Sequence, residues 1–324
     1  MGSSISFPRV SIPTDNIFVV TGGNTGIGYH TAKWLAMMGG TVIIACRSEE
    51  RAKKAIQQMN QEFAEEKRKK TTGVVDYDQL NLEFMHLDCS SLKSVVNFVQ
   101  AYKSSGRKLH KLICNAGIGF QDKLSHTEDG HEQIFQVNYL SQFLLVSLLL
   151  PVMKASGTDC RIVLVSSIAH EHARFDPNDI EGKKYSEPKY DATALYCRSK
   201  LYQVMQMYRL NQAIKDTDVT ALSLHPGIVR TPLLATFRRG STRVLMACLD
   251  CIGTSKSPFE GAWTSLNAAI NPELAGVRDV YFSECRPKEP ITAAKNKASQ
   301  DALWDHTLEC LKDYLPEDIL RELK

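Results

Sequence analysis

The sequence has no hydrophobic run long enough to cross a membrane and no secretory signal at its start. Its most apolar stretch covers residues 143–152, which is about half of the roughly 20 residues that a spanning helix needs. The opening MGSSISFPRV lacks the hydrophobic core of a signal peptide. We therefore expect a cytoplasmic protein without a transmembrane helix, in which residues 143–152 form a buried helix.

An excess of charge of one sign is also missing. The chain has 39 lysines and arginines against 36 aspartates and glutamates, which gives a net charge of +3. No basic stripe with interleaved aromatic residues occurs, so a nucleic-acid partner is not expected.

Metal-binding patterns are scarce as well. The nine cysteines lie mostly inside apolar stretches, which is typical of reduced core thiols in an intracellular protein. Cys248 and Cys251 form a C-x-x-C without a second pair or a histidine at metal-binding spacing. His170 and His172 are interpreted as surface-loop residues. The sequence therefore predicts no metal site.

What the chain does contain is a regular alternation of short apolar runs and longer helical patterns. The expected strands are 16–21, 41–46, 82–87, 111–114, 161–165, 219–224 and 279–283. Helical patterns lie between them, among them 49–68 and a long segment from about 130 to 154. This alternation predicts one α/β domain with a doubly wound parallel sheet of about seven strands and helices on both faces.

A glycine-bearing turn follows the first expected strand. Gly22, Gly26 and Gly28 stand at the spacing G-x-x-x-G-x-G in TGGNTGIG, directly before a helical pattern. Glycine permits positive φ and a close approach of the backbone to a pyrophosphate, and the following helix N-terminus favours an anion. The first βα turn therefore predicts dinucleotide binding in a Rossmann-type fold.

The end of the second expected strand indicates which dinucleotide. NAD sites place a carboxylate there, about 20 residues after the glycines, whereas this chain has Cys46 followed by Arg47. A guanidinium offers a planar fork to a 2′-phosphate, so the pattern favours NADP(H). The alternative is that Arg47 is a solvated helix-cap residue.

A Tyr-x-x-x-Lys pair, Tyr196 and Lys200, lies on a later helical pattern. Such a pair is common by chance, and alone it does not separate a catalytic pair from an ordinary surface pair. The two side chains share one helix face. A lysine charge beside the phenol would lower the tyrosine pKa toward working pH.

Five motifs in order carry a resemblance to a known family: TGGNTGIG, CNAG (114–117), IVLVSS (162–167), YCRSK (196–200) and HPGIVRT (225–231). Over residues 15–285 the chain resembles short-chain dehydrogenases/reductases. ACRSEERA and FEGAWTS further resemble the branch with the retinol dehydrogenases, the WW-domain oxidoreductase and the polyprenol dehydrogenase. One departure is Cys114, where the family usually has asparagine.

The resemblance implies roles for individual residues. Tyr196 would be the general acid/base, Lys200 its partner and ribose ligand, Ser167 the substrate-oxygen ligand, and Asn138 the holder of a proton-relay water. Cofactor contacts would come from the glycine loop, the strand ends and the segment after Pro-Gly: Gly22, Asn24, Thr25, Gly26, Ile27, Gly28, Arg47, Asp88, Asn115, Tyr196, Lys200, Val229 and Thr231.

The resemblance also implies a domain organisation and a substrate class. Residues 15–290 would form the catalytic domain, 1–14 an N-terminal arm, and 291–324 a helical segment packed on it. The segment 232–258 would be a substrate lid, and its many apolar residues suit a lipophilic small molecule; the alternative is an ordinary core helix. An NADP(H)-dependent oxidoreductase acting on a retinoid-, long-chain- or polyprenol-like alcohol or carbonyl is therefore expected.

Other interpretations stay open. The chain could be an NADP(H)-binding scaffold or sensor with weak turnover, or a nucleotide-sugar epimerase, although epimerases use a different glycine spacing.

MGSSIS fits the N-myristoylation pattern at Gly2. Together with the apolar, arginine-bearing lid it is consistent with peripheral membrane contact. The oligomeric state is undecided, and a homodimer is an alternative to a monomer.

Overall fold

The computed structural model describes residues 6–186, 189–231, 233 and 255–324. The predicted Gly2 modification site, the Cys248–Cys251 pair and nearly all of the predicted lid lie outside these residues. All seven expected strands form, each within two residues of its expected bounds: β1 (Ile17–Thr21), β2 (Thr41–Cys46), β3 (Leu82–His86), β4 (Lys111–Cys114), β5 (Cys160–Val165), β6 (Val219–His225) and β7 (Tyr281–Ser283). An eighth strand, β8 (Arg286–Pro287), was not expected, because two residues leave no periodic signal.

The strands form one sheet in the order β3-β2-β1-β4-β5-β6-β7-β8. All neighbours pair in parallel except β7 and β8, which are antiparallel. The chain reverses its winding direction between β1 and β4, so this point of the sheet is where open α/β folds bind ligands. The predicted doubly wound α/β fold is confirmed.

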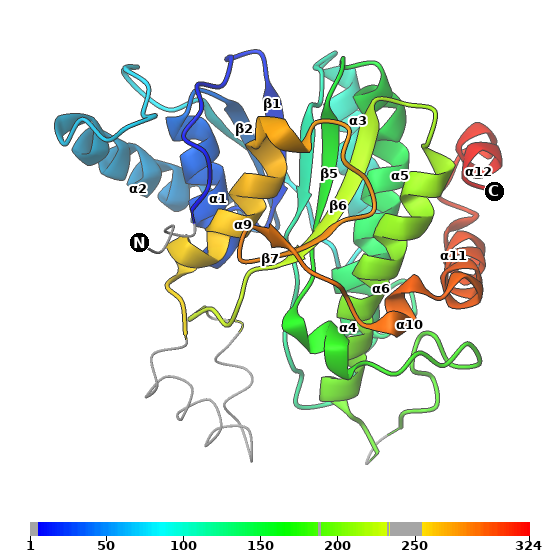
Figure 1. Ribbon diagram of the computed structural model, residues 1–324. Helices are drawn as coiled ribbons and strands as arrows, with labels where there is room; N and C mark the ends of the chain where they lie inside the picture. Colours follow the sequence, from blue (N-terminus) through cyan, green and yellow to red (C-terminus); the bar gives the residue numbers. More distant parts are fainter. Residues whose placement is uncertain (1–5, 187–188, 232, 234–254) are drawn as a thin grey trace.

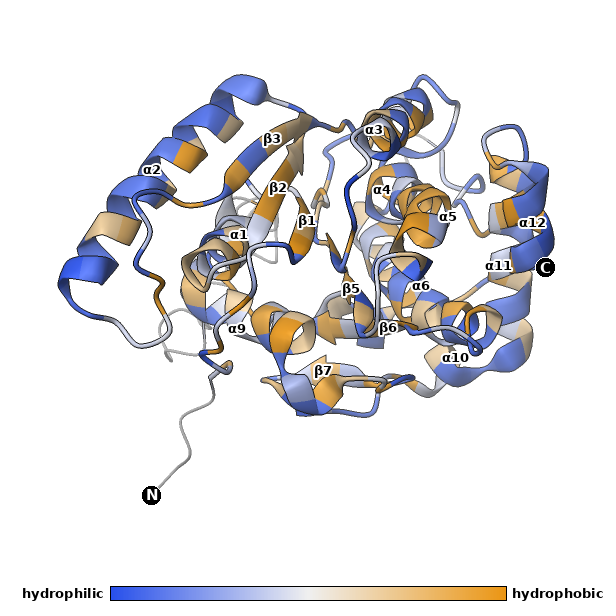
Figure 2. Cartoon of the chain, turned by 90° about the horizontal axis from the view of Figure 1, so that it is seen from above, coloured by the Kyte–Doolittle hydropathy of each residue, from blue (hydrophilic) through white to orange (hydrophobic). Residues whose placement is uncertain are grey.

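Helices cover both faces of the sheet (Figures 1 and 2). One face carries α1 (Gly26–Met37), α2 (Glu49–Arg68) and α9 (Pro258–Ile270). The other carries α3 (Leu92–Ser104), α5 (Ser141–Lys154) and α6 (Ala192–Ala213). Successive strand residues enter opposite cores: Phe18 and Val20 pack with α1, whereas Val19 packs with α3 and α5. This explains why the central strands contain consecutive apolar residues, such as residues 162–165 of β5.

The long helical segment expected from about 130 to 154 has three parts. A short α4 (Gln133–Phe135) leads into a π-helical turn (Gln136–Leu140) and then α5. In contrast to the expectation from the sequence, Gln133–Lys154 is long and apolar enough to span a membrane, but 94% of its most apolar window is buried inside the protein. The expected buried helix at residues 143–152 is therefore present.

The two ends of the described chain pack against the domain. The C-terminal helices α10 (Thr292–Lys295), α11 (Lys297–Leu311) and α12 (Glu317–Leu323) lie beside α5 and α6 (Figure 1). The indole of Trp304 packs edge-on against Phe143, with 4.8 Å between ring centroids, and donates a hydrogen bond to the Leu323 carbonyl at 2.8 Å. At the other end, Phe7 is buried against Trp34 of α1.

Candidate active site

A cleft of about 640 Å³ opens at the carboxyl ends of the central strands. It is lined by almost every residue that the sequence suggested for the site: Gly22, Asn24, Thr25, Gly26, Ile27, Gly28, Arg47, Asp88, Asn115, Ser167, Tyr196, Lys200, Val229 and Thr231. Asn138 is the exception, because it lies fully buried behind the wall of the cleft. The tertiary fold thus gathers residues from seven separate segments into one site.

The glycine loop forms the floor at the β1–α1 turn. Gly22 and Gly26 have φ values of +65° and +58°, which L side chains rarely adopt. A Cβ on Gly28 would lie 2.4 Å from the Gly22 carbonyl oxygen and 2.5 Å from Asn115 Nδ2. Asn115 Nδ2 donates to the Thr21 carbonyl at 2.9 Å, which fixes the loop to the end of β4. The turn therefore tolerates only glycine at position 28.

The first turn of α1 is placed to receive an anion. Gly26, Ile27 and Gly28 all line the cleft, and the N-cap Thr25 makes no side-chain capping hydrogen bond. The unpaired N–H groups and the positive end of the helix dipole favour a phosphate at this point. Because the glycines leave room for close backbone approach, the residues present fit a dinucleotide pyrophosphate.

Two arginines stand at the end of β2. The Arg47 side chain is 65% exposed, and its Nη1 atom lies 4.0 Å from Asp88 Oδ2. Arg51, one turn into α2, also lines the cleft. The N-cap of α2 is Ser48, whose hydroxyl accepts from the Arg51 amide at 3.3 Å, so Arg47 does not cap the helix through its side chain. Arg51 was missed in the sequence, although its four-residue spacing from Arg47 in CRSEER is a usable signal.

Tyr196 and Ser167 meet at the opposite end of the cleft. The Tyr196 side chain is buried on α6, and Ser167 follows β5. Burial raises the pKa of Tyr196 to about 12, and a hydrogen bond with Ser167 acts in the opposite direction. At neutral pH the phenol therefore keeps its proton.

Lys200 lies one turn along α6, with its Nζ atom 5.7 Å from the centroid of the Tyr196 ring. Nζ donates to the Val165 carbonyl and to Gln203 Oε1, both at 3.1 Å. Burial lowers the pKa of Lys200 to about 7. The expectation that Lys200 depresses the Tyr196 pKa does not match this structure, since burial penalises both the phenolate and the ammonium ion.

Asn138 belongs to the π-helical turn and holds the loop after β4. Its Oδ1 accepts from the Ile118 amide at 2.7 Å, and its Nδ2 donates to the Ile118 carbonyl at 3.0 Å. The Asn138 carbonyl accepts from Gln203 Nε2 at 3.0 Å. Gln203 thus connects Lys200 to Asn138, a link that sequence reasoning missed because no motif includes position 203.

Apolar side chains surround the tyrosine. Phe120 packs edge-on against Tyr196 with 5.7 Å between ring centroids, and Ile118 and Leu233 belong to the same cluster. Ile168, beside Ser167, lines the cleft and is 37% exposed; among the described residues it is the one exposed large hydrophobic side chain. The reacting end of the cleft is therefore mostly apolar.

His170 corrects an expectation, because it is buried rather than a surface-loop residue. Its Nδ1 lies 2.8 Å from the Ser167 carbonyl and 3.3 Å from the Tyr281 hydroxyl. Burial lowers its pKa. His170 therefore supports the backbone next to Ser167, while His172 is exposed as expected.

Comparison with known proteins agrees with this geometry. Residues 16–176 match the family model described as short chain dehydrogenase. Human polyprenol dehydrogenase is 35% identical over 300 residues, covering 91% of this chain and 84% of that protein. The chain belongs to the short-chain dehydrogenase family. Mouse retinol dehydrogenase 14 is 36% identical over 297 residues, with 89% of this chain and 83% of that protein covered.

The fold of this short-chain dehydrogenase is also that of solved structures. A protein from Mycobacterium paratuberculosis superimposes with a TM-score of 0.69 at 26% identity, covering 95% of this chain and 98% of that one. The expected family and its retinol dehydrogenase-like branch are thus confirmed, and the chain is an oxidoreductase.

Proposed function

We propose that this short-chain dehydrogenase uses NADP(H) to interconvert a lipophilic alcohol and its aldehyde or ketone, with Tyr196 as the general acid/base. The observation that carries the proposal is the hydrogen-bonded Tyr196–Ser167 pair at the apolar end of a cleft whose other end is a glycine-rich anion site. A bound nicotinamide dinucleotide supplies the hydride acceptor or donor. The residues described below bind the cofactor, orient the substrate and transfer the proton.

Arg47 and Arg51 support the choice of NADP(H) over NAD(H). Both arginines line the cleft just after β2, and the residue before Arg47 is Cys46 rather than a carboxylate. A 2′-phosphate would find two cationic donors there, whereas a bare ribose would find no carboxylate at the end of β2. Asp88 already pairs with Ser90 through its Oδ1 atom, at 2.9 Å from the amide and 2.7 Å from the hydroxyl.

The state of Tyr196 supports reduction as the direction that needs least rearrangement. With a pKa of about 12, its hydroxyl carries a proton at neutral pH and can donate it to a carbonyl oxygen held by Ser167. In the reverse direction the phenol must first lose that proton. A positive charge near the phenolate, such as Lys200 in its ammonium form, would assist this step.

The substrate class follows from the walls around the tyrosine. Ile118, Leu233 and the exposed Ile168 line the cleft and offer apolar contact to a hydrocarbon chain or ring. Phe120 packs edge-on against the tyrosine. Removing such surface from water contributes about 25 cal/mol per Å². The resemblance to retinol and polyprenol dehydrogenases points in the same direction. Long-chain, retinoid and polyprenoid alcohols or carbonyls are therefore the substrates to test.

The cofactor proposal is tested with a double substitution, Arg47→Ala with Arg51→Ala. We expect the KM for NADPH to rise at least about 10-fold, because each charge-assisted hydrogen bond is worth about 1.5 kcal/mol or more, while the KM for NADH changes little. Arg321→Ala is the control, since that arginine is exposed on α12. Equal losses for both cofactors would show that these arginines do not read the 2′-phosphate.

The role of Tyr196 is tested by Tyr196→Phe, with retinal and a long-chain aldehyde as substrates. We expect kcat to fall by about 10²- to 10⁴-fold, with NADPH binding, followed by fluorescence, nearly unchanged. Tyr208→Phe, on the same helix but outside the cleft, is the control. A wild-type protein that binds NADPH and reduces none of these carbonyls would instead support the scaffold or sensor interpretation.

A further inference from the structure

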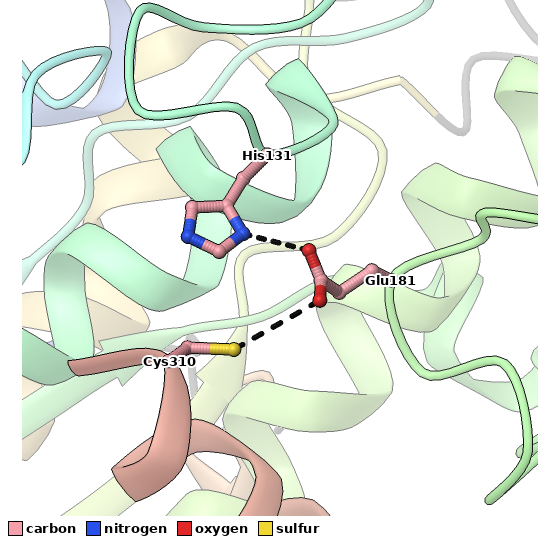
Figure 3. Close-up of side chains that lie close together, drawn as sticks. All are labelled: His131, Glu181 and Cys310. Carbon is pink, nitrogen blue, oxygen red and sulfur yellow. Dashed lines mark hydrogen bonds and ion pairs between the residues drawn. The ribbon is translucent and has the colours of Figure 1, made fainter. Parts of the chain in front are cut away.

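Outside the cleft, three side chains from distant parts of the sequence converge on one point (Figure 3). His131 lies just before α4, Glu181 in the loop that precedes α6, and Cys310 on α11. The His131 Nδ1 atom is 2.6 Å from Glu181 Oε2, and Cys310 Sγ is 3.9 Å from Glu181 Oε1. The three donor atoms all lie within 4.8 Å of one another.

A fourth donor stands one helical turn before the cysteine. His306 and Cys310 are four residues apart on α11, so both side chains lie on one face of the helix. The His306 Nε2 atom is 3.1 Å from Glu181 Oε1 and 3.4 Å from Cys310 Sγ. The group therefore offers two imidazole nitrogens, one carboxylate and one thiol.

We propose that His131, Glu181, His306 and Cys310 form a binding site for a zinc ion. Zn²⁺ prefers this mixture of nitrogen, sulfur and oxygen ligands in tetrahedral geometry. With Zn–N and Zn–O distances of about 2.0 Å and Zn–S of about 2.3 Å, the edges of the tetrahedron are roughly 3.3–3.6 Å. Glu181 Oε1 lies 3.1 Å from His306 Nε2 and 3.9 Å from Cys310 Sγ, and these two atoms are 3.4 Å apart, close to this range. His131 Nδ1 is 2.6 Å from the other carboxylate oxygen, Oε2, so the side chains must shift slightly for all four to bind one ion.

Charge and burial suit a divalent cation. Glu181 is 3% exposed, so its charge needs compensation from nearby groups. When zinc binds, the Cys310 thiol releases its proton to solvent, and the resulting thiolate and the carboxylate balance the two positive charges of the ion. Lys183, whose Nζ now lies 2.8 Å from Glu181 Oε1, has a 71% exposed side chain and can turn away into water.

Such a site would be structural rather than catalytic. Four protein ligands close the coordination shell and leave no position for a substrate. The ligands come from α11 and from two segments that border the catalytic face. His131 is two residues before Gln133, which lines the cleft, and Glu181 follows Ile180, whose carbonyl accepts from Tyr202 of α6 at 2.8 Å. The ion would hold α11 to both segments.

The test uses the full-length protein and ZnCl₂. After dialysis against zinc and then buffer, metal analysis should find one zinc per wild-type chain. Cys310→Ser should weaken zinc binding by more than the roughly 10- to 100-fold that follows loss of a group outside the ligand shell. Cys285→Ser is the matched control, since that half-buried cysteine pairs with Thr264 away from the cluster, and it should bind as the wild type does.

A second measurement does not depend on the folding of Cys310→Ser. Co²⁺ in place of Zn²⁺ gives a sulfur-to-metal absorption band when a thiolate is bound, and this band should appear in the wild type and persist in Cys251→Ser, which removes the C-x-x-C pair. Zinc should also raise the Tm of the wild type. Absence of the band, its loss in Cys251→Ser, or equal zinc binding by Cys310→Ser and Cys285→Ser would overturn the proposal.

Discussion

Lys200→Met should change how the stability of the protein depends on pH. Burial lowers the pKa of Lys200 from 10.5 to about 7 in the native state, whereas the unfolded chain keeps the ordinary value. Between these two pKa values the unfolded state binds more protons than the native state, so the free energy of unfolding rises with pH. The destabilisation is greatest below about pH 7 and is relieved as the pH increases.

The size of the effect follows from the same shift. Each pH unit in this window adds up to about 1.4 kcal/mol to the free energy of unfolding. From about pH 7 to about pH 9 the wild type should therefore gain roughly 2 kcal/mol relative to Lys200→Met, since the native lysine is already about half deprotonated at the lower limit. The measurements stop at about pH 9 because of Tyr196. Its native pKa is raised to about 12, so above pH 10 the unfolded phenol would ionise while the native one would not, and this would add a second pH dependence.

Urea denaturation followed by circular dichroism at the two pH values measures this gain. The comparison with Lys200→Met removes contributions from other titrating groups, and it also removes the pH-independent loss of the hydrogen bonds to Val165 and Gln203. Lys215→Met, at an exposed position after α6, is the control and should keep the wild-type slope. If wild type and Lys200→Met show the same pH dependence, the lysine is not desolvated as the structure indicates.

Two further substitutions test the cofactor loop and the C-terminal helices. Gly28→Ala should abolish measurable NADPH binding and destabilise the protein by about 1–3 kcal/mol, because its Cβ would lie 2.4 Å from the Gly22 carbonyl oxygen; cofactor fluorescence and thermal unfolding report both effects, and unaltered binding would contradict the assigned role of the loop. Trp304→Ala should cost about 3–5 kcal/mol, since it empties a fully buried site and frees the Leu323 carbonyl; a loss below 1 kcal/mol by urea denaturation would show that the C-terminal helices contribute little to stability.

The local sequence pattern was sufficient to predict the strands of the sheet and the glycine turn after the first strand. Short apolar runs between helical patterns located seven strands, because strands covered by helices on both faces are apolar at most positions. The spacing of Gly22, Gly26 and Gly28 located the turn after β1, because positive φ and close approach require glycine at fixed positions. Both signals are carried by residues that are close in the chain, so one sequence is enough to read them.

Only the tertiary structure decided the chemistry around these elements. The direction of the Tyr196 pKa depends on how deeply α6 is buried, which periodicity does not report. The π-helical turn that contains Asn138 leaves the hydrophobic pattern of its segment nearly unchanged. One hydrogen-bond partner of the buried His170 is Tyr281, more than a hundred residues away. The cluster around Glu181 joins residues 131, 181 and 310. Contacts at such separations are set by packing, because the short-range pattern of a single sequence carries no record of which distant side chains will share one point.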